Sequence, residues 1–173
     1  MNISIVGVTG SGKSTLASWL AERANLQHFE LDSLHWLPNW NNRSTEEFRS
    51  LVAKKTSGEN WVTCGNYREV RELIWSRSTH IIWLNYSFRV VLWRSLKRAF
   101  SRVLFKTEFC NGNTQSARDL FSRNSIILWL FRTYWKRRDE YKEKLVNTDL
   151  PLILIEVKHP RDLHSELKKA RII

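Results

Sequence analysis

Near its beginning the chain reads Gly7-Val8-Thr9-Gly10-Ser11-Gly12-Lys13-Ser14-Thr15, which satisfies the pattern G-x-x-x-x-G-K-[ST]. An apolar segment, Ile3 to Val6, precedes this run, and Leu16, Leu20 and Ala24 follow it at four-residue spacing. A strand, a glycine-rich turn and an amphipathic helix form the context in which this pattern binds phosphate. The sequence therefore predicts a phosphate-binding loop rather than a glycine-rich turn without a ligand.

The residue types in the loop predict how it would hold ATP and Mg²⁺. Glycines let backbone N–H groups surround the phosphates, and the start of the following helix adds positive potential. We expect Lys13 to reach the β and γ phosphates, Ser14 to bind Mg²⁺ and Thr15 to contact the α phosphate. The predicted nucleotide-binding residues are Gly7, Thr9, Gly10, Ser11, Gly12, Lys13, Ser14 and Thr15.

The remainder of the chain alternates short apolar runs with helical periodicity. Strands are predicted at Ile3 to Val6, His28 to Leu31, Trp61 to Cys64, His80 to Leu84 and Leu152 to Val157. Helices are predicted after the glycine loop, after Ser44, around Val70 to Ile74, from about Ser87 to Phe105, from about Ser116 to Leu145 and after Pro160. This alternation predicts a three-layer α/β fold with a mostly parallel sheet. A length of 173 residues suits a single domain over 1–173.

The charge of the chain is uneven. The formal net charge is +11, and residues 86–173 carry nineteen Lys and Arg against nine Asp and Glu, whereas residues 1–85 are nearly balanced. Such a field attracts polyanions, which include a triphosphate, nucleic acid and an acidic membrane surface. The sequence contains no recognised nucleic-acid-binding motif, so we expect any nucleic-acid binding to be non-specific.

Three further features concern the compartment of the protein. Two cysteines, Cys64 and Cys110, are too few for a disulfide framework. The N-terminus shows no secretory signal, and the longest apolar runs are far shorter than the roughly 20 residues that span a bilayer. We therefore expect a cytoplasmic protein without a membrane segment, and the sequence does not predict an oligomeric state.

Polar and aromatic side chains follow the second and third predicted strands, where a parallel sheet binds its ligands. Asp32 is expected to orient or deprotonate an acceptor hydroxyl, or to hold a Mg²⁺-bound water, unless it is a solvated loop residue or a helix cap. Asn66 and Tyr67 are candidates for an acceptor-binding wall. Trp36 and Trp40 are equally well explained as anchors that pack a loop on the core.

Basic residues on two predicted helices supply candidate catalytic cations. Arg94 and Arg98 are one helical turn apart and lie opposite the apolar face of their helix. They are expected to border the nucleotide and neutralise phosphate charge, although a solvated helix face is the simpler alternative. Four residues of the long helix, Arg132, Lys136, Arg137 and Arg138, are expected to converge from the other side. The predicted catalytic set is Lys13, Asp32, Arg94 and Arg98.

The combination of motifs resembles the adenylate-kinase-like P-loop proteins often labelled DNA topology modulation proteins. The resembling segments are the glycine loop, Leu31 to Trp36 with Pro38 and Trp40, Gly65 to Tyr67 with Arg71, then Arg89, Arg94 and Arg98, Thr107 and Glu108, Asn111 to Asn113, and Trp129 to Arg138. The resemblance implies a five-stranded sheet of the nucleoside-monophosphate-kinase type with a lid at about 106–118. It also implies substrate contacts by Trp36, Asn66, Tyr67, Arg71 and Arg89.

The chain departs from that family at two strand ends. Similar sequences usually carry aspartate where this chain has Cys64 and Asn85, and either aspartate would help to hold the magnesium shell. These departures leave Ser14 and Asp32 as the predicted metal-site residues. The predicted function is transfer of the γ-phosphoryl group of Mg-ATP to a nucleotide or another small acceptor. A nucleotide-switched nucleic-acid-binding regulator and an ATP-binding protein with little turnover are the alternatives.

Overall fold

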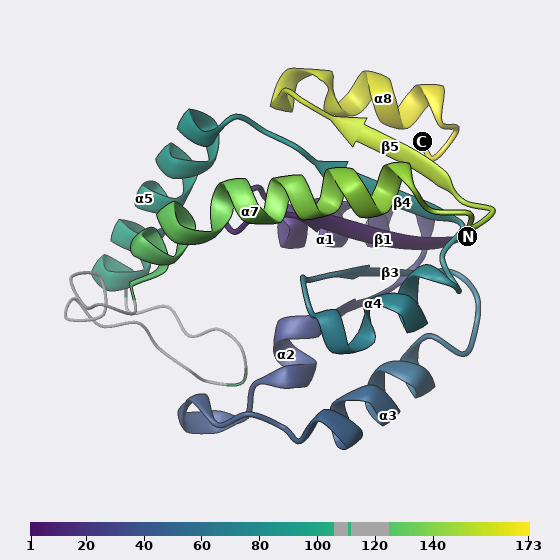
Figure 1. Ribbon diagram of the computed structural model, residues 1–173, viewed down its shortest axis with the longest axis horizontal. Helices are drawn as coiled ribbons and strands as arrows, with labels where there is room; N and C mark the ends of the chain where they lie inside the picture. The colour runs from purple at the N-terminus through teal and green to yellow at the C-terminus, as the bar shows by residue number, and fades with distance from the viewer. Residues whose placement is uncertain (106–110, 112–124) are drawn as a thin grey trace.

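The computed structural model describes residues 1–105, 111 and 125–173 and contains a five-stranded parallel sheet (Figure 1). The strands are β1 (Asn2–Gly7), β2 (Gln27–Glu30), β3 (Trp61–Cys64), β4 (His80–Leu84) and β5 (Ile153–Val157), in the spatial order β2-β3-β1-β4-β5. The predicted bounds of β3 and β4 match the structure, and the other strands differ by at most one residue at each end. The α/β fold class is therefore confirmed.

The helices follow the strands as the periodicity predicts. They are α1 (Lys13–Ala24), α2 (Leu31–His35), α3 (Thr45–Lys55), α4 (Arg68–Trp75), α5 (Phe88–Phe105), α7 (Ile126–Val146) and α8 (Leu163–Lys169), with 3₁₀ turns η1 (Pro38–Trp40) and η2 (Pro160–Asp162). Local capping explains two helix starts, because Ser44 Oγ accepts from Glu47 N and Ser125 Oγ accepts from Leu128 N, both at 3.2 Å. None of the helices in the described ranges is long and apolar enough to cross a membrane.

Two expectations concern residues that the structure describes only in part. The long helix is predicted from about Ser116, but α7 begins at Ile126, because Ser125 has an extended backbone and its side chain caps the helix there. The predicted lid, at about 106–118, lies outside the described residues except for Asn111.

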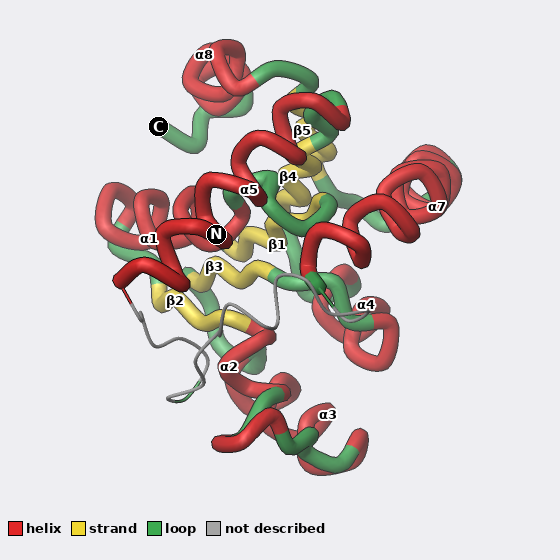
Figure 2. The backbone as a smooth tube through the Cα atoms, turned by 90° about the vertical axis from the view of Figure 1, so that its left-hand side faces the viewer, coloured by secondary structure: helices red, strands yellow, loops and turns green. Residues whose placement is uncertain are grey.

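The sheet is covered on both faces (Figure 2). Helices α1 and α8 pack on one face, where Leu20, Ile82 and Leu167 belong to one buried cluster. Helices α3, α4 and the second half of α7 pack on the other face, where Trp61 and Tyr141 belong to a second cluster. Burial on both faces explains why the strands read as continuous apolar runs rather than alternating ones.

The strand order fixes where a ligand can bind. The chain runs from the central strand β1 outward to β2 and back through β3, and it then continues on the other side of β1 with β4 and β5. Open parallel sheets bind ligands beyond the carboxyl ends of their strands, at the point where the order reverses. That point is the end of β1, which is where the glycine loop begins.

Candidate nucleotide-binding and catalytic site

The glycine loop has a backbone that only glycine accommodates, and α5 packs against it closely. Gly10 and Gly12 have φ angles of 77° and 95°, in the left-handed region. A Cβ atom on Gly10 would lie 2.1 Å from Ser95 Oγ, and one on Gly12 would lie 3.3 Å from Arg94 Nη1. These glycines therefore serve both the turn of the loop and the close approach of α5.

Lys13 lies inside the loop and has only neutral hydrogen-bond partners within the described residues. Its Nζ donates to the carbonyl oxygens of Gly7 (2.9 Å) and Val8 (3.0 Å). Loss of hydration lowers the pKa of Lys13 to about 8, although the nearby Asp32 carboxylate raises it in part. An ammonium held in this way gains a counter-ion when a phosphate enters the loop, as the motif predicts.

The start of α1 also fits a bound anion. Its N-cap is Gly12, which makes no side-chain cap, and its first turn contains no acidic residue. Ser14 and Thr15 are exposed there, and the buried Ser11 Oγ lacks a hydrogen-bond partner in the described structure. The first N–H groups of a helix need acceptors from outside it, and they favour anions. The loop therefore fits a triphosphate, and the exposed hydroxyl of Ser14 is an oxygen ligand of the kind that Mg²⁺ prefers.

Two arginines of α5 reach the loop, as the sequence predicts. Arg94 Nη1 donates to the carbonyl oxygen of Ser11 at 3.0 Å, and its guanidinium stacks 5.2 Å from the ring of Tyr86. Arg98 Nη2 donates to Thr9 Oγ1 at 3.4 Å. Each arginine therefore reaches the loop from outside, and the simpler interpretation, a fully solvated helix face, does not describe them.

The long helix α7 contributes one cation from the opposite side. Arg137 Nη1 donates to the carbonyl oxygen of Asn66 at 3.4 Å, and Arg137 lies close enough to Lys13 to lower the pKa of that lysine. Arg132, Lys136 and Arg138 are exposed on the same helix. Of the four basic residues expected to converge on the site from this helix, Arg137 contacts the site residue Asn66.

Asp32 lies near Lys13, but in a different element from the one predicted. The sequence places it directly after a strand that ends at Leu31, whereas β2 ends at Glu30 and Asp32 is in the first turn of α2. Its exposed carboxylate accepts a hydrogen bond from Tyr67 Oη at 2.8 Å and raises the pKa of Lys13. The structure therefore brings Asp32, Tyr67 and Lys13 together beyond the carboxyl ends of the strands.

Asn66 holds the loop rather than presenting a free amide. Its Nδ2 donates to the carbonyl oxygen of Gly7 at 2.6 Å, and its Oδ1 accepts from Tyr141 Oη at 2.6 Å. Burial raises the pKa of Tyr141 to about 12, so the phenol stays protonated and can donate this bond. Asn66 therefore links the end of β1 to α7.

The other predicted substrate residues are not gathered at the loop. Arg71 forms an ion pair with Glu140 of α7 at 2.8 Å and lies over the rings of Trp75 and Tyr141. Arg89 is exposed in the first turn of α5. Their substrate contacts stay predictions.

Trp36 belongs to an aromatic group that begins in α2. Its ring packs at 5.1 Å from His35 and 5.5 Å from Trp40, between ring centres. His35 in turn lies 4.6 Å from the ring of Tyr67, which holds Asp32. The interpretation of Trp36 as a loop anchor therefore fits its contacts, and the group also borders the Asp32 side of the site.

The two positions that depart from the family pattern have different surroundings. Cys64 Sγ donates to Ser14 Oγ at 3.7 Å, and burial raises the pKa of the thiol to about 12. Asn85 Nδ2 donates to Glu156 Oε1 of β5 at 2.6 Å. Cys64 therefore borders the predicted magnesium ligand, whereas the Asn85 side chain is bound to the neighbouring strand.

Sequence reasoning missed three residues that support the site. Ser95 packs against Gly10, Tyr86 lies under Arg94, and Tyr141 holds Asn66. Ser95 lies within one helical turn of both predicted arginines, and that spacing indicates that it lies near the site. Tyr86 and Tyr141 gave no such signal, because an aromatic residue in a helical or apolar pattern is usually part of the core.

Comparison with known proteins gives one relative over a short segment and another over nearly the full length. The chain matches no protein-family model. It is 36% identical over 66 residues to the uncharacterized protein YqaC of Bacillus subtilis (strain 168), and this match spans 37% of each chain. It is 26% identical over 187 aligned residues to a shikimate kinase of Rippkaea orientalis, which covers 98% of this chain and 87% of the relative.

Solved structures share the fold over nearly the full length. A shikimate kinase from Bacteroides thetaiotaomicron superposes with a TM-score of 0.57 at 14% identity, covering 99% of this chain and 96% of the other. A gluconokinase from Sinorhizobium meliloti 1021 gives 0.53 at 15% identity, covering 98% and 92%. The fold is that of P-loop kinases, and the comparisons together support the phosphotransferase class of the nucleoside-monophosphate-kinase type for this chain. None of these relatives has a name that refers to DNA topology.

Proposed function

We propose that this protein transfers the γ-phosphoryl group of Mg-ATP to a hydroxyl or phosphate oxygen of a small acceptor. The observation that carries the proposal is the convergence of Lys13, Arg94 and Arg98 on one glycine loop that faces the carboxylate of Asp32. Phosphoryl transfer is catalysed mainly by positioning and by neutralising the charge on the phosphate oxygens. The site contains cations that can neutralise phosphate charge and a carboxylate that can position an acceptor.

The proposed reaction assigns one task to each part of the site. The loop N–H groups and Lys13 hold the triphosphate, and Arg94 and Arg98 balance the charge that spreads over the γ-phosphate oxygens. Asp32, held by Tyr67, orients the acceptor hydroxyl and takes its proton as the new P–O bond forms and the bond to the β-phosphate oxygen breaks. Ser14, whose exposed hydroxyl lies at the start of α1, would hold Mg²⁺, and the ion would supply positive charge against the triphosphate.

The acceptor is proposed to be a small molecule that enters beside α2. Asp32, Tyr67 and the aromatic group of Trp36 border that side, and a nucleotide base or another small compound can pack on aromatic rings. The relatives named shikimate kinase and gluconokinase have the same fold, which favours a small metabolite over a protein acceptor. A nucleoside monophosphate remains an alternative within the same proposal.

A coupled ADP-release screen tests this function. The purified protein is incubated with Mg-ATP and, one at a time, shikimate, gluconate, nucleosides and nucleoside monophosphates. We expect one acceptor class to stimulate ADP release and expect Lys13→Ala to abolish that stimulation. Lys55→Ala, which changes an exposed lysine at the end of α3, is the matched control and should keep it. Tight ATP binding without stimulation by any acceptor would contradict the proposal and favour an ATP-binding protein with little turnover.

A further inference from the structure

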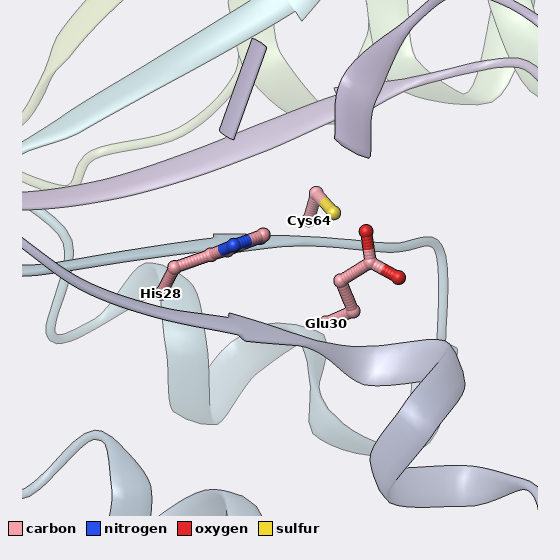
Figure 3. Close-up of side chains that lie close together, drawn as sticks. All are labelled: His28, Glu30 and Cys64. Carbon is pink, nitrogen blue, oxygen red and sulfur yellow. The ribbon is translucent and has the colours of Figure 1, made fainter. Parts of the chain in front are cut away.

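Three potential metal ligands lie together on the sheet, beside the glycine loop. His28 and Glu30 of β2 and Cys64 of β3 each place one ligand atom so that all three atoms lie within 4.8 Å of one another. Figure 3 shows the imidazole of His28 and the carboxylate of Glu30 on the side of β2 on which Cys64 lies. We call this group the His28–Glu30–Cys64 triad.

The strand pairing places the triad on one face of the sheet. His28 and Glu30 are two residues apart on β2, so their side chains project to the same side. Glu30 is the direct partner of Cys64 in the parallel pairing of β2 with β3, and paired neighbours share a face. Cys64 belongs to the buried cluster that includes Leu16 and Ala17 of α1, so this is the α1 face. Paired strands hold the backbone of all three residues.

His28 and Glu30 are available to bind an ion in the described structure. His28 is exposed and Glu30 is half-buried, and neither side chain forms a hydrogen bond or an ion pair with a described residue. Cys64 is 4% exposed and has one weak contact, to Ser14 Oγ at 3.7 Å. Because β2 is the edge strand of the sheet, an ion from solvent can reach the triad past His28.

The spacing needs only a small adjustment to bind a metal ion. Zn²⁺ binds nitrogen and oxygen at about 2.0–2.2 Å and sulfur at about 2.3 Å, so tetrahedral ligands lie roughly 3.5 Å apart. The ligand atoms of the triad lie within 4.8 Å of one another. Rotation of the His28 and Glu30 side chains shortens these distances to the spacing that Zn²⁺ needs. Both residues are accessible enough to rotate, and the buried thiol stays in place.

We propose that the His28–Glu30–Cys64 triad binds a borderline-soft divalent cation of the Zn²⁺ type. Imidazole, thiolate and carboxylate are the ligands that Zn²⁺ prefers, whereas Mg²⁺ prefers oxygen alone. One carboxylate and one thiolate balance the two positive charges, and the thiol proton passes to solvent as the metal–sulfur bond forms. A water completes the four-coordinate shell. This site is distinct from the oxygen-ligand Mg²⁺ position proposed above.

Cobalt provides the direct probe, because Co²⁺ occupies Zn²⁺ sites and reports its ligands by absorption. We expect titration of the full chain with Co²⁺ to give one ion per chain, a thiolate-to-cobalt band in the near ultraviolet and visible bands typical of tetrahedral cobalt. Equimolar Zn²⁺ should bleach these bands, and millimolar Mg²⁺ should not. Absence of the bands at about 100 µM Co²⁺ would overturn the proposal, because a three-ligand site on ordered strands should be filled there.

Variants assign the ligands. His28→Gln and Glu30→Gln should each weaken Co²⁺ binding by about tenfold or more, and Cys64→Ser should remove the thiolate band. Cys110→Ser and His164→Ala change the other cysteine and a histidine of α8, and both should leave the titration unchanged. A thiolate band that persists in Cys64→Ser, or that disappears in Cys110→Ser, would overturn the assignment.

The test does not depend on any single variant folding well. Cys64 is buried, so its replacement is checked by circular dichroism, and the accessible positions His28 and Glu30 supply variants that leave the core intact. Wild-type affinity in both of those variants would overturn the site whatever the Cys64→Ser protein does. The measurement uses metal binding alone, so failure of the proposed kinase activity would not affect it.

Discussion

The glycine loop and the helices α5 and α7 contribute to the same site in different ways. The loop places Lys13, Ser14 and Thr15 by local geometry, because nine consecutive residues contain the turn, the cation and the hydroxyls. The helices α5 and α7 carry many basic residues, and the structure shows contacts with site residues from Arg94, Arg98 and Arg137. The role of a contiguous motif can therefore be predicted from the sequence alone. The basic residues of a helix that contribute to the site can be identified only once the packing of the helix is known.

The largest effect is expected in the loop. Lys13→Ala removes the cation that we propose faces the β and γ phosphates, so ATP-analogue affinity should fall at least about 100-fold and transfer about 10³-fold. Titration with a fluorescent ATP analogue and an ADP-release assay measure the two quantities. Lys55→Ala is the control, and circular dichroism checks the fold. Unchanged affinity in Lys13→Ala would contradict the proposed binding of the triphosphate in the glycine loop.

Asp32 should be nearly as sensitive in transfer, but not in ATP binding. Asp32→Asn keeps the size of the side chain and loses its charge, so transfer should fall by about 10²-fold, the scale of a positioned base. ATP-analogue affinity should change little, because the loop supplies most of that contact. Asp149→Asn, in the turn before β5, is the matched control. An Asp32→Asn protein with wild-type transfer would contradict the assigned role.

A paired change on α5 tests the helix side of the comparison. Arg98 contacts Thr9 of the loop, whereas Lys97, its neighbour, is exposed. Arg98→Ala should lower transfer by about 10-fold to 10²-fold, because it removes one cation from the phosphate oxygens. Lys97→Ala should have no effect in the same ADP-release assay. Equal losses in both variants would mean that the general positive field of α5 acts, rather than one placed guanidinium.

The lowered pKa of Lys13 predicts a pH dependence of nucleotide binding. Bound phosphate favours the charged lysine, so its pKa in the complex lies above the value of about 8 in the free protein. Affinity is then fully present below pH 8 and declines above it, by about tenfold between pH 7 and pH 9. Titrations of an ATP analogue at several pH values measure this, with Lys13→Met as the control. The same slope in Lys13→Met would assign the titration to another group.

The smallest effect is expected at the end of β4. Asn85→Asp replaces an amide donor, 2.6 Å from Glu156 Oε1, with a second carboxylate. The facing charges raise the pKa of the pair in the folded state, so stability is lost as pH rises and regained near pH 5. We expect a loss of about 1–3 kcal/mol at pH 7.5, measured by urea unfolding. Asn42→Asp, at an exposed position, is the control. A stable Asn85→Asp protein whose transfer depends more tightly on Mg²⁺ would instead support a magnesium-binding role for an aspartate at this position, as the family resemblance implies.

The sequence predicted the fold better than it predicted the environment of single residues. Strand and helix positions follow from apolar runs and from caps such as Ser44, which act through residues close along the chain. The sequence predicts Asp32 at a strand end because its neighbours Phe29 and Leu31 continue an apolar run, but β2 ends at Glu30 and α2 begins immediately. The sequence predicts Arg71 and Asn66 at a substrate, but Arg71 pairs with Glu140, and the Asn66 amide is bound to Gly7 and Tyr141.

The sequence by itself determined the glycine loop, the alternating α/β order and the positions of the strands. Each of these depends on residue spacing within one short segment, where backbone conformation and burial follow a fixed period. Tertiary structure alone decided which cations reach the loop, that Asn85 binds Glu156, and that His28, Glu30 and Cys64 share one face of the sheet. These contacts join residues that are distant along the chain, so they depend on strand order and helix packing, which no local pattern encodes.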